Sequence, residues 1–99
     1  MVYQGVCLET ILKTIEEKLT FKGNDLSNPT DWNLELNLPV QEIINKSPKE
    51  IDKIRYIIKM LEIMDYIKFK HGDYSVIENL TANGFKFLVF QLHQIDFKY

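Results

Sequence analysis

The chain has 99 residues, of which 45% are hydrophobic, 26% charged and 12% aromatic, and its formal net charge is −2. This length fits one domain spanning residues 1–99, and the apolar content is sufficient for one core, which argues against disorder. A net negative charge excludes a polycation that coats nucleic acid through bulk charge, but it leaves room for a local basic face.

Cysteine content and hydropathy limit the cellular compartments in which the chain is expected. Cys7 is the single cysteine, so an intrachain disulfide is excluded and a reducing compartment is favoured. No apolar run approaches the roughly 20 residues of a membrane span. The first nine residues lack the basic and then apolar stretches of a signal peptide. We therefore expect a cytoplasmic domain without membrane contact.

The first part of the chain predicts one helix followed by a less regular stretch. From about Val6 to Thr20, apolar residues recur at helical spacing, at Leu8, Ile11, Leu12, Ile15 and Leu19. Residues 25–38 carry a weaker pattern, in which Trp32 is a candidate core anchor. Leu34, Leu36 and Leu38 alternate with polar residues, as in a strand. A short helix from Pro39 to Asn45 would then turn its apolar residues inward, namely Val40, Ile43 and Ile44.

The sequence Ser47-Pro48-Lys49-Glu50 predicts the start of a longer helix that ends near Met64. The serine can cap the free amide groups, the proline suits the first helical position, and the glutamate can reach back to the cap. At 100° per residue, one face gathers Ile51, Ile54, Ile58, Leu61 and Asp65. The opposite face gathers Lys49, Asp52, Lys53, Tyr56, Lys59, Met60 and Ile63, with Arg55 on the flank.

The last third of the chain predicts a β-hairpin and a final helix. Residues 66–70 alternate as in a strand, residues 71–73 (His-Gly-Asp) can turn the chain, and residues 74–80 form the returning strand. Thr81 can then cap a helix that continues to about Tyr99. The expected order is helix, strand, short helix, long helix, hairpin and helix, which is an α+β fold.

Two local motifs make this order resemble the winged helix-turn-helix fold, with a C-terminal helix after the wing. Residues 60–67 (Met-Leu-Glu-Ile-Met-Asp-Tyr-Ile) look like the segment where a recognition helix ends and the wing begins, with Asp65 where relatives often have glycine. Residues 80–88 (Leu-Thr-Ala-Asn-Gly-Phe-Lys-Phe-Leu) are similar to the Leu-Thr-x-x-Gly motif of multiple-antibiotic-resistance and phenolic-acid-response regulators. They also resemble small winged-helix proteins of phages and plasmids.

Charge is distributed unevenly along the chain. Residues 1–45 hold three lysines and seven acids, residues 46–70 hold seven basic residues and four acids, and residues 71–99 hold two lysines and three acids. The net charges of these segments are −4, +3 and −1, which sum to −2. The positive segment is the one that the resemblance assigns to the recognition helix and the wing.

The resemblance implies that double-stranded DNA meets this positive segment, with the third helix in the major groove and the wing on phosphates. The residues expected at this interface are Lys49, Lys53, Arg55, Tyr56, Lys59, Lys68, Lys70 and His71. The alternative is a solvated, lysine-rich helix face without a ligand. Only one arginine is present, and because bidentate reading of guanine favours arginine, phosphate binding is better supported than base readout.

The final helix carries more apolar residues than one packed face needs. Phe85, Leu88, Leu92, Ile95 and Tyr99 form one stripe, and Phe87, Phe90 and Phe97 form a second, displaced stripe. Since exposed apolar surface commonly marks an interface, we expect a homodimer through the second stripe. The alternative is that residues 21–38 fold back over it.

The sequence shows no constellation of catalytic or metal-binding residues. The candidate ligands Cys7, His71 and His93 have no metal-like spacing, and the glycines stand alone rather than in a phosphate-binding loop. We therefore expect neither an enzyme nor a cofactor or metal. The first hypothesis is a dimeric transcriptional regulator, phage- or plasmid-encoded. The second is a winged-helix module that binds another protein through its acidic first half or its aromatic last helix, without binding DNA.

Overall fold

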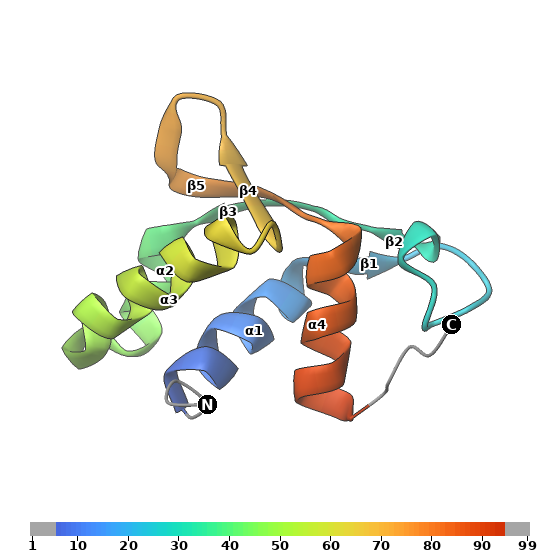
Figure 1. The fold of residues 1–99 in the computed structure, drawn as a ribbon, viewed down its shortest axis with the longest axis horizontal. Helices are drawn as coiled ribbons and strands as arrows, with labels where there is room; N and C mark the ends of the chain where they lie inside the picture. The colour runs from blue at the N-terminus through green and yellow to red at the C-terminus, as the bar shows by residue number, and fades with distance from the viewer. Residues whose placement is uncertain (1–5, 95–99) are drawn as a thin grey trace.

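The computed structural model describes residues 6–94. Its elements, in chain order, are α1 (Val6–Lys18), β1 (Thr20–Phe21), η1 (Pro29–Asp31), β2 (Trp32–Asn33), β3 (Glu35–Pro39), α2 (Val40–Lys46), η2 (Pro48–Glu50), α3 (Ile51–Ile63), β4 (Ile67–Lys70), β5 (Asp73–Leu80) and α4 (Ala82–His93). The architecture is α+β, with four α-helices and two antiparallel sheets among these residues (Figure 1).

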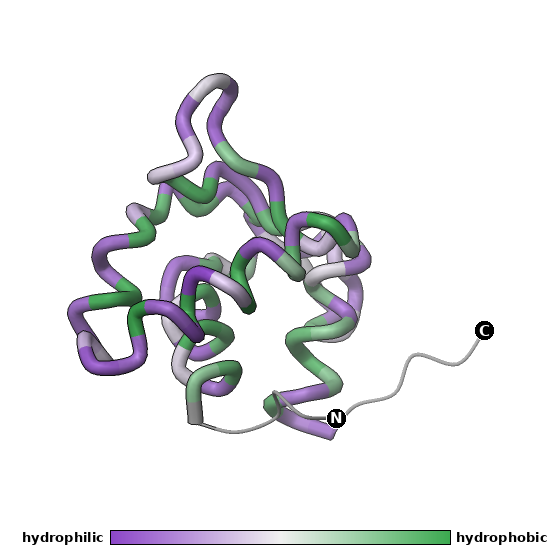
Figure 2. The backbone as a smooth tube through the Cα atoms, turned by 60° about the vertical axis from the view of Figure 1, so that its left-hand side comes forward, coloured by the Kyte–Doolittle hydropathy of each residue, from purple (hydrophilic) through white to green (hydrophobic). Residues whose placement is uncertain are grey.

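The larger sheet has the strand order β3-β5-β4, so the longest strand lies in the middle. Both neighbours of β5 run antiparallel to it, and β4 and β5 form a hairpin. The end of this hairpin extends away from the helices and is largely hydrophilic (Figures 1 and 2). The smaller sheet is the two-residue pairing of β1 with β2.

The hydrophobic core lies between the sheet and the helices, with α1 between α3 and α4 (Figure 1). Helical spacing places Ile11 and Ile15 of α1 at its centre, where both are fully buried. Thr14 lies on the same buried face, and its hydroxyl donates to the carbonyl oxygen of Thr10 at 2.7 Å, which satisfies the polar group. This core holds α3 and α4 in fixed positions on either side of α1.

Most of the predicted elements are confirmed. The first helix, the strand that contains Leu36 and Leu38, the short helix and the hairpin occur within a few residues of their expected bounds. The short helix buries its three predicted apolar side chains, which are Val40, Ile43 and Ile44. Trp32 is half-buried against the core, and its ring lies 5.6 Å from that of Phe85.

The predicted capping box at residues 47–50 is wrong. The side chain of Ser47 makes no capping hydrogen bond, and residues 48–50 form a 3₁₀ turn before α3 begins at Ile51. Ser47 is the only residue between α2 and this turn, and its N–H donates to the carbonyl of Ile44 at 3.0 Å. Because its backbone already ends α2, it does not take the extended conformation typical of a side-chain cap.

Two further expectations about the helices need correction. The last helix ends at His93 rather than near Tyr99, because Gln94 adopts a left-handed conformation (φ 59°) and its N–H bonds the carbonyl of Phe90. Asp65 does not lie on the inner face of α3, since that helix ends at Ile63 and Asp65 is exposed. The inner face instead includes Ile57.

The stretch between α1 and β3 folds back toward α4, as in the alternative considered for the dimer, but its contact through Trp32 is with Phe85 of the first apolar stripe. The β1–β2 pair brings Phe21 against Trp32, with ring centroids 5.2 Å apart. The indole N–H of Trp32 donates to the carbonyl of Leu26 at 2.9 Å, and the carboxylate of Asp31 accepts the amide of Asp25 at 2.9 Å. These contacts give the stretch a fixed shape beside the first half of α4.

The end of α3 is a two-bond helix cap with aspartate in the glycine position. Asp65 has φ 62°, its N–H donates to the carbonyl of Glu62 at 2.9 Å, and the N–H of Tyr66 donates to the carbonyl of Leu61 at 2.9 Å. This is the Schellman pattern, in which a left-handed residue reverses the chain after a helix. The expectation that Asp65 would supply the left-handed residue is confirmed.

The first turn of α4 packs against the same chain reversal after α3. The N–H of Thr81 donates to the carbonyl of Tyr66 at 3.0 Å, and its hydroxyl accepts the N–H of Gly84 at 2.9 Å, as the predicted cap requires. A Cβ atom at Gly84 would lie 2.0 Å from the carbonyl oxygen of Tyr66. Position 84 therefore has to be glycine because backbone from another element touches it.

Substituting Gly84 tests this contact. We expect Gly84→Ala to lower the free energy of unfolding by about 2–3 kcal/mol, because the new methyl group has to displace backbone. Helix propensity alone would raise it by about 1 kcal/mol. Urea unfolding measures the difference, with Asn83→Ala as the control, since Asn83 is exposed in the same turn. A Gly84→Ala variant as stable as the parent would contradict the close approach.

Candidate nucleic-acid interface

The outward face of α3 is fixed by what its other face buries. Ile54, Ile57, Ile58 and Leu61 pack into the core. Lys53, Arg55, Tyr56 and Lys59 are consequently exposed, as is Lys49 in the preceding turn. The structure thus places the five predicted contact residues of this segment on the outside of one helix and its first turn.

The hairpin presents the remaining predicted residues. Ile67 of β4 is buried, and strand alternation then leaves Lys68 and Lys70 exposed. His71 is exposed at the turn, next to Gly72, which has φ +75°. The lysines and the histidine therefore lie on the projecting part of the molecule.

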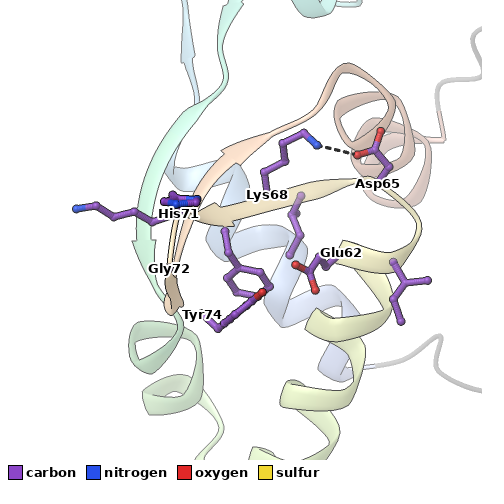
Figure 3. A pocket seen from close by; sticks show the side chains of 10 residues that line it. Glu62, Asp65, Lys68, His71, Gly72 and Tyr74 are labelled. Atoms are coloured by element: carbon purple, nitrogen blue, oxygen red, sulfur yellow. Dashed lines mark hydrogen bonds and ion pairs between the residues drawn. The ribbon is translucent and has the colours of Figure 1, made fainter.

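A groove separates α3 from the hairpin and brings the two sets of residues together. It consists of two adjoining hollows of about 510 and 190 Å³ that share Glu62, Phe69 and Tyr74. The larger hollow reaches Lys68, Lys70 and His71, and the smaller one reaches Arg55 and Lys59. Figure 3 shows Glu62 of α3 and Tyr74 of the hairpin directed into the same space.

Most acids of the first half of the chain have an ion-pair or hydrogen-bond partner within the same molecule. Three of the seven lie in ion pairs, Glu9 with Lys13, Glu17 with Lys46 and Glu42 with Lys18, and the carboxylate of Glu16 lies 2.6 Å from the imidazole of His93. Two more, Asp25 and Asp31, accept hydrogen bonds within their own loop. Of the seven, Glu35 alone has no such partner among residues 6–94. Glu9, Glu17, Asp25 and Glu35 are nevertheless exposed, so this half of the chain keeps acidic groups at the surface.

Cations of the α3–hairpin side are less engaged. Lys53 pairs with Glu50 at 3.3 Å, and Lys68 pairs with Asp65 at 3.1 Å (Figure 3). Four others have no carboxylate within 4.0 Å among the described residues: Lys49, Arg55, Lys59 and Lys70. The acids of α3 and the hairpin that have no ion pair among the described residues are Asp52, Glu62, Asp73 and Glu78, so the excess of positive charge lies along residues 46–70, whose net charge is +3.

Asp73 shapes the end of the hairpin. Its carboxylate accepts hydrogen bonds from the hydroxyl and the amide of Ser75, which bulges β5 between the residues paired with Phe69 and Lys70. The hydroxyl contributes most and the amide next to a pKa of Asp73 that lies below its ordinary value, assisted by the charge of Lys70. The two hydrogen bonds from Ser75 therefore favour the ionised form of Asp73 in this turn.

Residues predicted for the dimer interface have different surroundings. Phe87 is half-buried and stacks on Tyr66, with ring centroids 4.6 Å apart. Phe90 is 44% exposed. Phe97 lies outside the described residues. The stretch before β3 contacts α4 through Trp32 and Phe85, which belongs to the first apolar stripe.

The three candidate metal ligands do not meet. Cys7 is half-buried on α1, His71 lies at the hairpin turn, and the imidazole of His93 lies 2.6 Å from the carboxylate of Glu16. No group of three or more possible ligands from His, Cys, Asp and Glu occurs in the part of the chain that the structure describes.

Sequence reasoning missed the residues that form the floor and the middle of the groove. Glu62, Phe69 and Tyr74 come from α3, β4 and β5, and no local pattern links them. Tyr74 follows the hairpin turn in a strand that buries Ile77 and Leu80. Because these two positions do not follow strict alternation, the pattern did not predict on which face of the strand Tyr74 lies.

Comparison with known proteins gives no match for this chain, whether with protein-family models, curated proteins or solved structures. Across residues 6–94, no helix has both the length and the apolar character needed to cross a membrane.

The hairpin turn should respond to acid. The low pKa of Asp73 means that its ionised form is favoured by folding, so this stabilisation is present above the pKa of the unfolded chain and is lost as the pH falls through the lower folded value. An NMR titration of the Asp73 carboxyl should give a midpoint below that of Ser75→Ala. Ser27→Ala, which removes the equivalent contact at Asp25, should leave the Asp73 midpoint unchanged. Equal midpoints in the parent and Ser75→Ala would contradict this role of Ser75.

Proposed function

We propose that the chain is a winged helix-turn-helix DNA-binding protein that acts as a dimeric transcriptional regulator. The order of its main elements is helix, strand, helix, helix, hairpin and helix, and the strand order β3-β5-β4 places the hairpin at one edge of the sheet. One residue separates α2 from the turn that leads into α3. This arrangement supports α3 as the recognition helix and the β4–β5 hairpin as the wing.

The observation that carries the proposal is the distribution of unpaired cations. Lys49 in the turn before α3, Arg55 and Lys59 on α3, and Lys70 on the hairpin have no ion pair among residues 6–94, and the segment 46–70 that holds them has a net charge of +3. Phosphate oxygens can satisfy such cations and release bound counterions, which drives association. A net charge of −2 is therefore compatible with a directed DNA-binding face.

In the proposed complex, α3 lies in the major groove and the hairpin contacts the flanking backbone. Lysines provide point charges for phosphates, whereas Arg55 is the one side chain that can read guanine through two parallel hydrogen bonds. Most of the affinity would then come from the backbone, and discrimination between sequences would depend on few contacts.

Duplex binding measured at two salt concentrations tests this function. With about four phosphate contacts, the affinity should fall roughly 100-fold between 50 and 200 mM salt, since the slope is about −0.9 per contact. Arg55→Glu/Lys59→Glu should weaken binding at low salt by at least about tenfold, because two attractions become repulsions. Fluorescence anisotropy with a labelled duplex gives both values.

The matched control is Lys13→Glu/Lys22→Glu, which changes the net charge equally. Lys13 and Lys22 are exposed and lie on α1 and in the loop after β1, away from the groove between α3 and the hairpin. This control should bind duplex nearly as the parent does. Undetectable binding at low salt, or equal losses in both double variants, would reject a directed interface.

Binding to another protein is a second candidate, favoured by exposed apolar side chains beside the groove. Ile63 is 65% exposed and Met64 is 51% exposed at the end of α3. Such residues are unusual on a surface without a partner when they adjoin one another. This second function would be supported if the chain does not bind DNA but self-associates or binds another protein through this end of α3.

Dimer formation is proposed through α4, where Phe90 is exposed on the face away from Leu88 and Phe85. Light scattering at tens of micromolar should give the mass of two chains. Phe90→Glu should give one chain, because a charge at the interface is costly to bury, and Gln91→Glu is the control on a half-buried neighbour. A parent protein with the mass of one chain would exclude this dimer.

A further inference from the structure

Tyr74 is the most exposed large side chain of apolar character among residues 6–94, with 73% of its surface accessible. It lies on β5 directly after the hairpin turn, and its ring meets that of Phe69 edge to face at 5.3 Å. The Phe69 ring holds Tyr74 on one side, while the rest of the Tyr74 ring faces the groove. The hairpin therefore offers an ordered aromatic surface to a ligand.

Charged groups surround this aromatic surface. Arg55 and Lys59 lie on the α3 side of the groove, and Lys70 lies on the hairpin side. Glu62 lies between them and faces Tyr74 across the groove (Figure 3). A ligand that fits has negative charge where it meets the rim, a flat ring in the middle, and a hydrogen-bond donor directed at Glu62.

We propose that the groove between α3 and the hairpin binds an unpaired nucleotide, with its base stacked on Tyr74 and its phosphates held by Lys59 and Lys70. This inference rests on the proposed DNA-binding function and extends it to a junction between duplex and single strand. Stacking on an aromatic side chain requires a free face of a base, and bases inside a duplex present only their edges. A cationic groove with an aromatic floor is the usual combination for single-stranded nucleic acid.

Glu62 favours a base over a phosphate in the middle of the groove. A carboxylate repels phosphate at close range but accepts a hydrogen bond from the amino group of cytosine or adenine. The neighbouring acid Asp65 is engaged with Lys68 at 3.1 Å, so Glu62 is the carboxylate that remains for the ligand. Cytosine is consequently a suitable base for the test.

The experiment compares three labelled DNAs at one salt concentration. They are a blunt duplex, the same duplex with a four-nucleotide dC extension, and the same duplex with an abasic extension of equal length. The dC extension should bind at least about 5-fold more tightly than the abasic one, because stacking of one base contributes about 1–3 kcal/mol. The phosphates are equal in both, so the difference isolates the bases.

Variants at position 74 assign the gain to the tyrosine ring. Tyr74→Ala should lose the preference for dC over abasic DNA while its blunt-duplex affinity stays within about twofold of the parent. Tyr74→Phe should retain the preference because it retains the ring face. Equal affinities for the two extended DNAs, or an unchanged preference in Tyr74→Ala, would overturn the inference.

Failure of the proposed function gives a different result. If the blunt duplex does not bind, single-stranded dC and abasic oligonucleotides replace the extended duplexes. A Tyr74-dependent preference for dC then still supports the groove as a nucleotide site, and equal binding of the two oligonucleotides rejects it.

Discussion

The arrangement of the surface depends on one backbone contact, between the first turn of α4 and the chain reversal after α3. Gly84 lies so close to the carbonyl of Tyr66 that no side chain fits there, and Thr81 joins the same segment through its N–H and hydroxyl. The chain enters β4 directly after Tyr66 and leaves β5 directly before Thr81. Both ends of the hairpin are therefore fixed at a single point, beside the end of the helix that it faces.

This constraint gives the groove its two walls. The left-handed Asp65 sends the chain from α3 into β4 within a few residues, so Glu62 of the helix faces Phe69 and Tyr74 of the hairpin. A helix and a hairpin joined only by a loose loop would have no fixed separation. Here the separation is determined by backbone hydrogen bonds, and the Tyr66–Phe87 ring stack adds packing on the α4 side. The flexible lysines are consequently carried by a rigid frame, which lowers the entropy lost on binding a ligand.

Local periodicity was sufficient to predict most of the helices and the hairpin, because each of these depends on residues close together in the sequence. It failed where tertiary contacts decide. The β1–β2 pair has two residues in each strand and depends on Trp32 meeting Phe21 and Phe85, which no local pattern encodes. The capping role predicted for Ser47 was wrong because the same residue ends α2. The aromatic part of the site was missed because Tyr74 and Glu62 are brought together by the Asp65 reversal.

Ion pairs between residues far apart in the sequence join segments whose charges were counted separately. Lys46 pairs with Glu17, and His93 lies against Glu16, so pairs separated by 29 and 77 residues join segments that a count along the chain treats as independent. Exposed pairs of this kind add little to stability, but they cancel charge that a ligand would otherwise meet. Lys49, Arg55, Lys59 and Lys70, which have no ion pair among residues 6–94, lie on α3, on the turn before it and on the hairpin, whereas Lys22, which also has none, lies in the loop after β1. Residues 46–70 carry a net charge of +3 although the formal net charge of the chain is −2, so the net charge of the whole chain does not describe the face that α3 and the hairpin present.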